Sequence, residues 1–409
     1  MSQPPFIQRL KLKNFLSFDS VGVDVELRPL NILIGTNGSG KSNFLYAIKL
    51  LKSLPTGLWE FLREGGGIGE WLYKGDASEA VAEIEVTINL KVILPNKTVD
   101  KALRYSLDFL VQNDQLLVDK EMLLDNDKLP NFEEALYYQY NPRISFRAPF
   151  IVQIREQGED LFDTPTPSTA HRQSVYQHTR HEFQYPVLTQ TGKAFERIGI
   201  YLDLPFGKDA PYRKPQLAES FDEENLAPDG SNLAIVLNHT QTFHPDAMDE
   251  IFEKFKKLLS RTKRIQPNTT SNLIRLFVHE VMGKGKTVPI SAYRLSDGTL
   301  RFLCLLVILL SPTPPPLVCI EEPEIGMHPE MLLFIAELLK EASTRTQIIV
   351  TTHSDILLSM FEPEDVLVCE HDGAKSSIKR LSAEKLKSWC EGDYALGEMW
   401  LSNAFGGVR

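Results

Sequence analysis

The feature that most constrains this chain is the glycine-rich stretch Gly35–Ser42, of sequence GTNGSGKS. It follows the apolar run Leu30–Ile34, which predicts a buried strand, and it precedes a helical pattern. Its glycines allow a tight backbone turn whose N–H groups surround phosphate oxygens, next to the positive end of the helix dipole. In this arrangement Lys41 reaches the β- and γ-phosphates of a nucleotide and Ser42 binds Mg²⁺. A chance match is expected in roughly one chain in a hundred of this length.

Composition narrows the class of protein further. The 409 residues carry a net charge of −10, which argues against a whole surface built for nucleic acid but leaves room for a local basic patch. Four cysteines form no CxxC pair, so we expect a reducing compartment without a disulfide framework or zinc site. The longest apolar run, 302–310, is too short to span a bilayer, and the N-terminus lacks a signal-peptide pattern. We therefore expect a cytoplasmic protein that does not enter the membrane.

A second apolar strand is predicted at 317–320, and it ends in Glu321, Glu322 and Pro323. Such a strand delivers carboxylates to the edge of a parallel sheet, where nucleotide sites lie. One carboxylate can hold the Mg²⁺ shell and the next can orient or deprotonate the attacking water. By itself this pattern is equally compatible with a solvated acidic turn; beside a phosphate-binding loop it favours a catalytic pair.

Two more segments could complete a nucleotide site. Ser296 and Gly298 lie at the start of the apolar helix expected from Thr299. They could form a second anion-binding site at this helix N-terminus; the simpler alternative is that Ser296 only caps the helix. His353 follows the buried strand predicted at 347–350, at the position expected for a γ-phosphate sensor. A lone histidine after a strand is more often structural.

Taken in order, these motifs resemble the ATP-binding-cassette ATPases. Residues 10–15, LKLKNF, together with 37–43, NGSGKSN, are similar to the RecF/SMC branch of these proteins. Segments 226–233, 295–301 and 396–407 resemble compact bacterial predicted ATPases associated with anti-phage systems. The resemblance covers both ends of the chain and thins out over 110–225.

The resemblance implies roles only where the motif matches. Nucleotide contacts would come from the phosphate-binding loop and the signature segment: Gly35, Thr36, Asn37, Gly38, Ser39, Gly40, Lys41, Ser42, Asn43, Ser296, Gly298 and Thr299. Glu322 matches the catalytic carboxylate and His353 the switch histidine, with Lys41 also acting on the phosphates. Ser42, Glu321 and Gln190 would hold Mg²⁺; Glu321 replaces the usual Asp, and Gln190 is proposed from its position alone.

The expected fold class is α/β: an ATPase head of the ATP-binding-cassette type with a mixed central sheet, an antiparallel β arm, a helical lobe and an inserted subdomain. The arm is predicted from the alternating run at 80–94 and its continuation at 103–109. The long middle segment lacks heptads, which excludes a long coiled coil. The expected division is 1–110 with the phosphate-binding loop, 111–285 as the insertion, and 286–409 with the other motifs.

These features predict an ATPase whose ATP-driven head dimerisation acts on DNA or controls a DNA-acting partner, in phage defence or DNA repair. Its cofactors would be ATP and Mg²⁺, and its partners a second copy, or more, and a separate nuclease or toxin. The alternative is a nucleotide-gated scaffold that binds and releases such an effector. Small-molecule kinases and transporter subunits fit the motifs less well. The basic run 254–264 is either a solvated helix end or a phosphate contact, and His171, His178 and His181 suggest a polar loop rather than a metal site.

Overall fold

A computed structural model describes residues 4–75, 81–94, 96–112, 115–129, 135–140, 152–156, 159–162, 174–177, 182, 185–217, 224–384, 386 and 394–407. The chain divides into two compact units. Unit 1 comprises Met1–Ile198 and Glu362–Arg409, and unit 2 comprises Gly199–Phe361. The boundaries of these two units differ from those of the three segments expected from the sequence. The three-part division stays a prediction.

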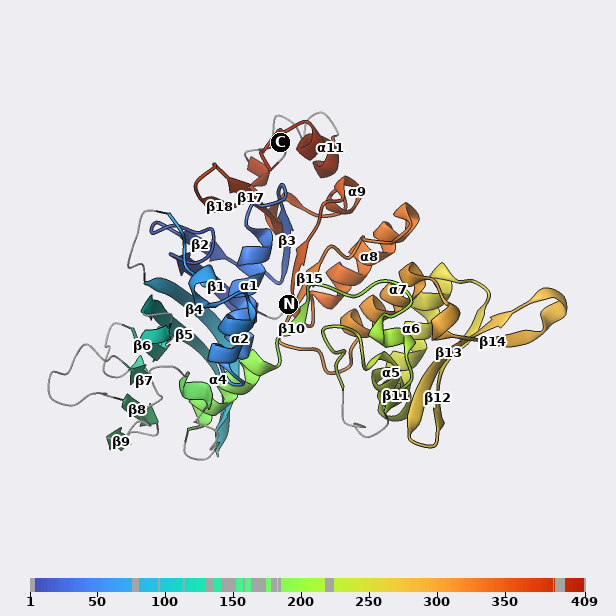
Figure 1. Cartoon of the computed structure of the whole chain (residues 1–409), viewed down its shortest axis with the longest axis horizontal. Helices are drawn as coiled ribbons and strands as arrows, with labels where there is room; N and C mark the ends of the chain where they lie inside the picture. The colour runs from blue at the N-terminus through green and yellow to red at the C-terminus, as the bar shows by residue number, and fades with distance from the viewer. Residues whose placement is uncertain are drawn as a thin grey trace. The chain divides into compact units, whose positions relative to one another are not determined.

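Unit 1 contains a large antiparallel sheet of eight strands (Figure 1). Its order is β2-β1-β4-β5-β6-β7-β8-β9, with bounds β1 Ile7–Lys13, β2 Val23–Glu26, β4 Ala82–Leu94, β5 Lys97–Gln112, β6 Gln115–Asp125, β7 Leu136–Tyr140, β8 Val152–Glu156 and β9 Glu159–Phe162. β4 and β5 form the hairpin predicted from the alternating pattern, and Ala82 pairs with Phe109 at its base. The alternation buries one face, as period-two sequences require.

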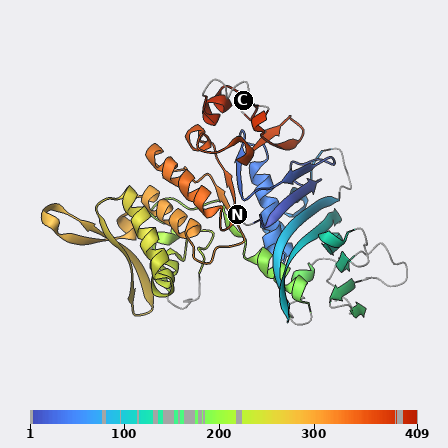
Figure 2. The same ribbon diagram turned by 180° about the vertical axis from the view of Figure 1, so that it is seen from behind.

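Helices cover one side of this sheet. α1 (Lys41–Ser53), α2 (Leu58–Glu64) and α4 (Pro186–Glu196) lie on the same face of β4 and β5 in both views (Figures 1 and 2). Unit 1 also holds β3 (Leu30–Ile34), which pairs in parallel with β17 (Val366–His371); β18 (Ser376–Arg380) runs antiparallel to β17. α11 (Leu396–Leu401) and short 3₁₀ turns at Ile68–Trp71, Asn126–Lys128, Val175–Gln177 and Pro363–Asp365 complete its described elements.

Unit 2 is built on three parallel strands. β10 (Gly199–Tyr201), β15 (Leu317–Glu321) and β16 (Gln347–Thr351) pair in that order, so β15 and β16 end at the same edge. The connecting helices are α7 (Asp297–Leu309), α8 (Pro329–Ala342) and the one-turn α9 (Asp355–Leu358). α7 is apolar on nearly its whole surface and is buried along its length, as such helices are.

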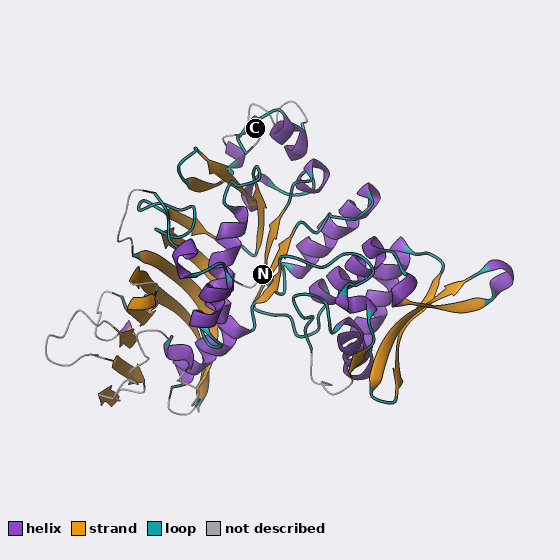
Figure 3. Cartoon of the chain, viewed as in Figure 1, coloured by secondary structure: helices purple, strands orange, loops and turns teal. Residues whose placement is uncertain are grey.

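A second, antiparallel sheet in unit 2 carries a protruding hairpin. Its strands are β11 (Gln216–Leu217), β12 (Thr262–Thr270), β13 (Leu273–Val281) and β14 (Thr287–Ser291), with 3₁₀ turns at Pro211–Arg213, Gly283–Gly285 and Ala292–Arg294. Helices α5 (Leu233–Phe243) and α6 (Pro245–Leu258) pack beside it. The β13–β14 hairpin extends beyond these helices (Figure 3).

Most predicted elements lie where the sequence placed them, and the differences have local causes. The helical pattern of residues 231–262 predicts one helix, but the structure has two, because His244 leaves the helical conformation and Pro245 starts α6. The last residue of this range, Thr262, begins β12, whose polar sequence gave no strand signal. No described helix exceeds the 14 residues of α6 and α8, in agreement with the predicted absence of a long coiled coil. Within the described part of the chain, no helix combines the length and apolar character needed to cross a bilayer.

Candidate functional site

The loop after β3 has a backbone that only glycine adopts easily. All five residues of β3 are buried, and the chain then turns through Gly35, Gly38 and Gly40, whose φ angles are 150°, 78° and 105°. A Cβ at Gly35 would lie 2.3 Å from the carbonyl oxygen of Cys369, and one at Gly40 would lie 2.5 Å from Ser376 Oγ. Side chains at these positions would therefore collide with β17 and β18, so the glycine pattern is required by packing as well as by φ.

Lys41 begins α1 and folds back over the loop. Its ammonium is largely buried, and Nζ donates hydrogen bonds to the carbonyl oxygens of Gly35 at 2.8 Å and Thr36 at 3.0 Å. The N-cap residue of α1, Gly40, has no side chain with which to cap the helix, and Asn37 and Gly38 are exposed. Within the described residues, the buried Ser39 Oγ has no hydrogen-bond partner. A buried cation, an uncapped helix start and an open glycine turn fit a bound phosphate chain.

The residues after Lys41 are tied to neighbouring segments of unit 1. Asn43 donates from Nδ2 to Ser17 Oγ at 2.7 Å, and Ser376 Oγ donates to the same oxygen at 2.7 Å. This triad joins α1 to the turn after β1 and to the start of β18, and so holds the loop. Ser42 is half-buried in the first turn of α1, where its hydroxyl fits the role of a Mg²⁺ ligand.

In unit 2, the ends of β15 and β16 bring Glu322 and His353 together. Glu321 pairs with Thr351 in the parallel register, and the next residue, Glu322, takes a positive φ of 45° while its N–H donates to Thr351 O at 3.0 Å. His353 Nε2 lies 3.4 Å from Glu322 Oε1. The two side chains are 34% and 29% exposed, so they face solvent rather than the core. A strained residue at a sheet edge beside a polar partner is a typical feature of functional sites.

A third carboxylate, Glu324, supports this pair, and the sequence analysis did not single it out. Its Oε1 accepts hydrogen bonds from Thr352 Oγ1 at 2.7 Å and from the backbone N–H of His353 at 2.8 Å. Its Oε2 is buried with no hydrogen-bond partner in the described part of the chain. Burial raises the pKa of Glu324, and the charge of Glu322 raises it further. The signal available in the sequence was a third acid, two residues after the adjacent pair.

The predicted signature segment begins α7. Ser296 caps this helix: its Oγ accepts from Thr299 N–H at 3.1 Å and lies 2.7 Å from Thr299 Oγ1. A Cβ at Gly298 would lie 2.5 Å from the carbonyl oxygen of Gly326, so a glycine is needed for this close approach. Ser296 itself is exposed. Ser296 therefore has the capping role that was the simpler alternative. Its signature role, contact with the ATP of a partner subunit, stays a prediction.

A buried arginine, Arg213, holds residues 292–297, the loop that leads into the signature segment and is called the signature loop below. No pattern in the sequence pointed to this arginine. Arg213 donates to the carbonyl oxygens of Leu295 at 2.7 Å and Ala292 at 3.0 Å, and its Nη2 lies 2.6 Å from Asp297 Oδ1. Asp297 also accepts from Gly207 N–H at 3.0 Å. The hydrogen bond from Arg213 lowers the pKa of Asp297 despite the opposing effect of burial. The loop therefore has a fixed geometry before any ligand binds.

Gln190 has a different environment from the one expected of a metal ligand. It lies on α4, and its amide exchanges two hydrogen bonds with the backbone of Ile93, at 2.8 Å and 2.7 Å, which tie α4 to the end of β4. The structure therefore gives this side chain a packing role, and we do not include it in the site proposed below. The histidines at 171, 178 and 181 lie outside the described residues. Elsewhere, no cluster of three or more His, Cys, Asp or Glu residues could hold a metal ion in the described ranges.

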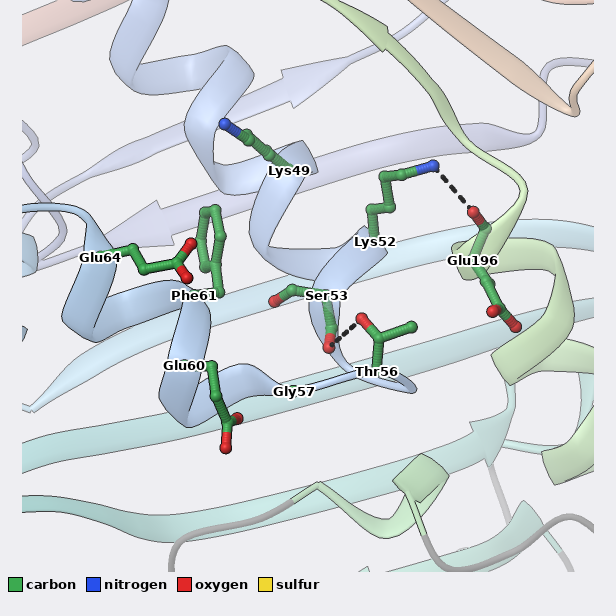
Figure 4. A pocket seen from close by; sticks show the side chains of 9 residues that line it. All are labelled: Lys49, Lys52, Ser53, Thr56, Gly57, Glu60, Phe61, Glu64 and Glu196. Atoms are coloured by element: carbon green, nitrogen blue, oxygen red, sulfur yellow. Dashed lines mark hydrogen bonds between the residues drawn. The ribbon is translucent and has the colours of Figure 1, made fainter. Parts of the chain in front are cut away.

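A pocket in unit 1 lies at the other end of α1 (Figure 4). Lys52 Nζ donates to the carbonyl oxygens of Glu196 at 2.9 Å and Ile198 at 2.5 Å at one side of it. The 13 residues of α1 extend about 20 Å at 1.5 Å per residue, which separates this pocket from the phosphate-binding loop. Its lining mixes lysines and glutamates, namely Lys49, Lys52, Ser53, Thr56, Gly57, Glu60, Phe61, Glu64 and Glu196, and we assign no nucleotide contact to it.

These features define a P-loop ATPase head of mixed α/β architecture, and comparison with solved structures agrees. The chain is similar to the Smc head crystallised with the C-winged helix domain of ScpA, with a TM-score of 0.57 and 15% identity over 94% of this chain and 100% of that one. It is also similar to a Smc head with an extended coiled coil bound to the C-terminal domain of ScpA, from Pyrococcus furiosus, with a TM-score of 0.53 and 14% identity over 95% and 99% of the two chains. At this level of identity the likeness concerns the fold.

The family follows from the sequence match. Residues 30–359 match the model described as "AAA domain, putative AbiEii toxin, Type IV TA system", which covers most of the chain. The chain belongs to this family of AAA-domain proteins. The predicted resemblance to SMC-like ATPases and the predicted fold class are thereby confirmed.

Proposed function

We propose that this protein is an ATPase in which ATP joins two copies of the chain and is hydrolysed by Glu322. The observation that carries the proposal is the pair of Glu322 and His353 at one sheet edge, in a chain that also has a complete phosphate-binding loop. The strained φ of Glu322 and the burial of the Glu324 carboxylate beside the His353 segment both cost free energy, which a purely structural turn would not need to spend.

The roles follow from the chemistry of each group. Lys41 and the N–H groups of the loop would hold the phosphates, and Ser42 with Glu321 would hold Mg²⁺, whose charge offsets that of the phosphates. Glu322 would accept the proton of the attacking water, and His353 would donate a hydrogen bond to the γ-phosphate. The water oxygen then forms the new P–O bond while the bond to ADP breaks. This scheme requires the phosphate-binding loop and the carboxylates to act on the same nucleotide.

The dimer is proposed from the signature segment. The helix start at exposed Ser296 and half-buried Gly298 would meet the γ-phosphate held by a second copy, so that each closed pair has two composite sites. Closure would then act on DNA or on a DNA-acting effector, in phage defence or repair. A partner protein is supported by the two similar Smc heads, each crystallised with a domain of ScpA, and a link to toxin–antitoxin systems by the description of the family.

A nucleotide-gated scaffold is the second candidate. Phe206, Tyr293 and Ile325 are exposed hydrophobic residues of unit 2, and a protein partner that covers them would remove their apolar surface from water. In this scheme slow hydrolysis would time the release of a separate toxin or nuclease. Co-purification of the native complex, followed by turnover assays with and without DNA, separates the two candidates.

The catalytic proposal is tested with Glu322→Gln, which keeps the shape and loses the base. We expect ATP affinity within about 3-fold of wild type and a turnover lowered about 10²- to 10⁴-fold, the usual contribution of a general base. The matched control is Glu330→Gln, because Glu330 is an exposed carboxylate in the first turn of α8. Equal turnover in both variants would remove Glu322 from the mechanism. Loss of turnover in Glu321→Gln alone would reverse the roles of the two glutamates.

A further inference from the structure

The charge of this chain is distributed unevenly, and one short segment has the opposite sign to the rest. Residues 261–291 contain six Lys or Arg residues and one acid, Glu280, so the segment carries +5. Because the whole chain carries −10, the remaining residues sum to −15. The segment forms β12, β13 and β14 of unit 2 and the hairpin that extends beyond its helices (Figures 1 and 3).

The register of this sheet separates an apolar face from a cationic one. Cross-strand partners share a face, and Arg264 is opposite His279 while Arg275 is opposite Asn268. The alternate residues point the other way and are buried against α5: Ile265, Ile274, Leu276 and Val278. Arg264, Asn268 and Arg275 are exposed. The sheet is thus fixed by its apolar face. On the other face Arg264, Asn268 and Arg275 reach solvent, whereas Gln266, Phe277 and His279 are half-buried.

The one acid of the segment does not neutralise this face. Glu280 is 5% exposed and lies on the apolar side of β13, where Arg261 Nη2 approaches it at 3.6 Å. Lys263, beside the β-bulge of β12, and Lys286, next to the hairpin turn, are both exposed. Burial lowers the pKa of His279, and the neighbouring Arg264 lowers it further, so His279 is neutral at pH 7. The positive charge of the face is therefore supplied by lysine and arginine at all physiological pH values.

The structure also divides the basic run noted in the sequence. Lys254, Lys256 and Lys257 lie on α6 among acids of the same helix, and Lys254 pairs with Glu341. Arg261, Lys263 and Arg264 belong to the sheet segment. The helix part is the solvated face expected as one alternative, whereas the sheet part continues onto a surface without exposed acids in its described strands.

From these observations we infer that the exposed face of β12, β13 and β14, with the hairpin turn, binds the phosphodiester backbone of a nucleic acid. Arg264 and Arg275 are separated by four residues along the strands, about 14 Å at 3.4 Å per residue, which spans about four base pairs of a duplex. Polar side chains on the same face can donate hydrogen bonds to phosphate and sugar oxygens: Gln266 lies between the two arginines, Asn268 is opposite Arg275, and Thr270 lies beyond it. A two-stranded ribbon also fits the major groove of B-form DNA.

This inference rests on the proposed function in one respect, because it names nucleic acid as what the ATPase acts on. The binding itself needs no nucleotide and can be measured alone. For about five phosphate contacts, affinity falls about 500-fold between 50 and 200 mM salt, since the slope of log K against log salt is about −0.9 per contact. The inference therefore predicts both an affinity for nucleic acid and the slope with which that affinity falls as salt is raised.

The test is fluorescence anisotropy of a labelled 30-base-pair DNA with the full chain, without ATP, over this salt range. Arg264→Glu/Arg275→Glu should lower affinity at least 10-fold at 100 mM salt and reduce the slope by about 2. The control Lys256→Glu/Lys257→Glu makes the same change of charge on α6 and should stay within about 2-fold. Single-stranded DNA and duplex RNA of equal length identify the preferred form. Denaturation midpoints of both variants, measured alongside, verify that they fold.

Three outcomes would overturn the inference. The first is that the wild-type protein binds no nucleic acid at 50 mM salt. The second is that the two double variants lose DNA affinity equally. The third is that poly-glutamate competes for the protein as well as DNA does, which would indicate an acidic protein partner. ATP turnover is measured on the same samples without nucleic acid. Turnover without DNA binding rejects only this inference, and DNA binding without turnover rejects only the proposed function.

Discussion

Replacing Arg213 with methionine should destabilise unit 2 and disable the signature loop. The guanidinium is 5% exposed and donates to backbone carbonyls of Leu295 and Ala292 as well as to Asp297. Methionine fills much of the volume but removes this donor from four carbonyl oxygens, those of Gly207, Ala292, Tyr293 and Leu295. The oxygens of Gly207 and Ala292 keep a backbone N–H partner, so the cost of about 1–3 kcal/mol for each unsatisfied oxygen applies to the other two. The pair with Asp297, whose side chain is 37% exposed, adds little because solvent screens it. We therefore expect a loss of about 2–5 kcal/mol in the free energy of unfolding.

Urea denaturation, followed by tryptophan fluorescence and circular dichroism, measures this loss. The control is Arg294→Met, since Arg294 is exposed in the same loop and should change stability by less than about 0.5 kcal/mol. At a temperature where Arg213→Met is still folded, its ATP affinity should match wild type while its turnover falls, because the loop that carries Ser296 has lost its support. Equal denaturation midpoints for the two variants would refute the reasoning.

Three further predictions concern the loop, the signature and pH. Lys41→Ala should weaken ATP binding in calorimetry about 10- to 150-fold, as expected for loss of a charge-assisted hydrogen bond, and unchanged affinity would place the site elsewhere. Ser296→Arg should bind ATP but neither close nor hydrolyse it; normal turnover would leave Ser296 as a helix cap only. Because the pKa of Asp297 is lowered in the folded state, its contribution to stability is complete above about pH 4 and is lost as pH falls through the folded pKa. Asp297→Asn should therefore reduce the loss of stability on the acid side by a small amount, less than about 1 kcal/mol because the carboxylate is partly exposed, and an acid-side slope equal to that of the wild type would contradict the assignment.

The parts of this structure that could be predicted are those whose sequence carries a local period or a fixed spacing. β3, β15 and β16 lie within a residue or two of their expected positions, and α1 follows the phosphate-binding loop as expected, because apolar strands and amphipathic helices follow from local patterns. The phosphate-binding loop was predictable for the same reason: three glycines and one lysine at fixed spacing satisfy both φ and packing.

What could not be predicted depends on contacts between distant residues. Arg213 reaches a loop about 80 positions later in the chain, and no pattern near it distinguishes it from a surface arginine. Glu324 acquires its place only because β15 and β16 end at the same edge, which puts it beside Thr352 and His353. The cationic sheet face likewise depends on strand pairing, since β12 alone is polar and contains a proline. Side chains that act through tertiary pairing leave at most a weak local signal in a single sequence, such as the third acid at Glu324.

The central claim, that ATP joins two copies of this chain, is tested most directly by the mass in solution of Glu322→Gln with and without ATP and Mg²⁺. This variant should bind ATP without consuming it and so accumulate the closed form. Light scattering should then report an ATP-dependent rise from the 46.4 kDa of one chain to at least twice that mass, and the rise should be absent in Glu322→Gln/Ser296→Arg. A mass that does not respond to saturating ATP would contradict the account.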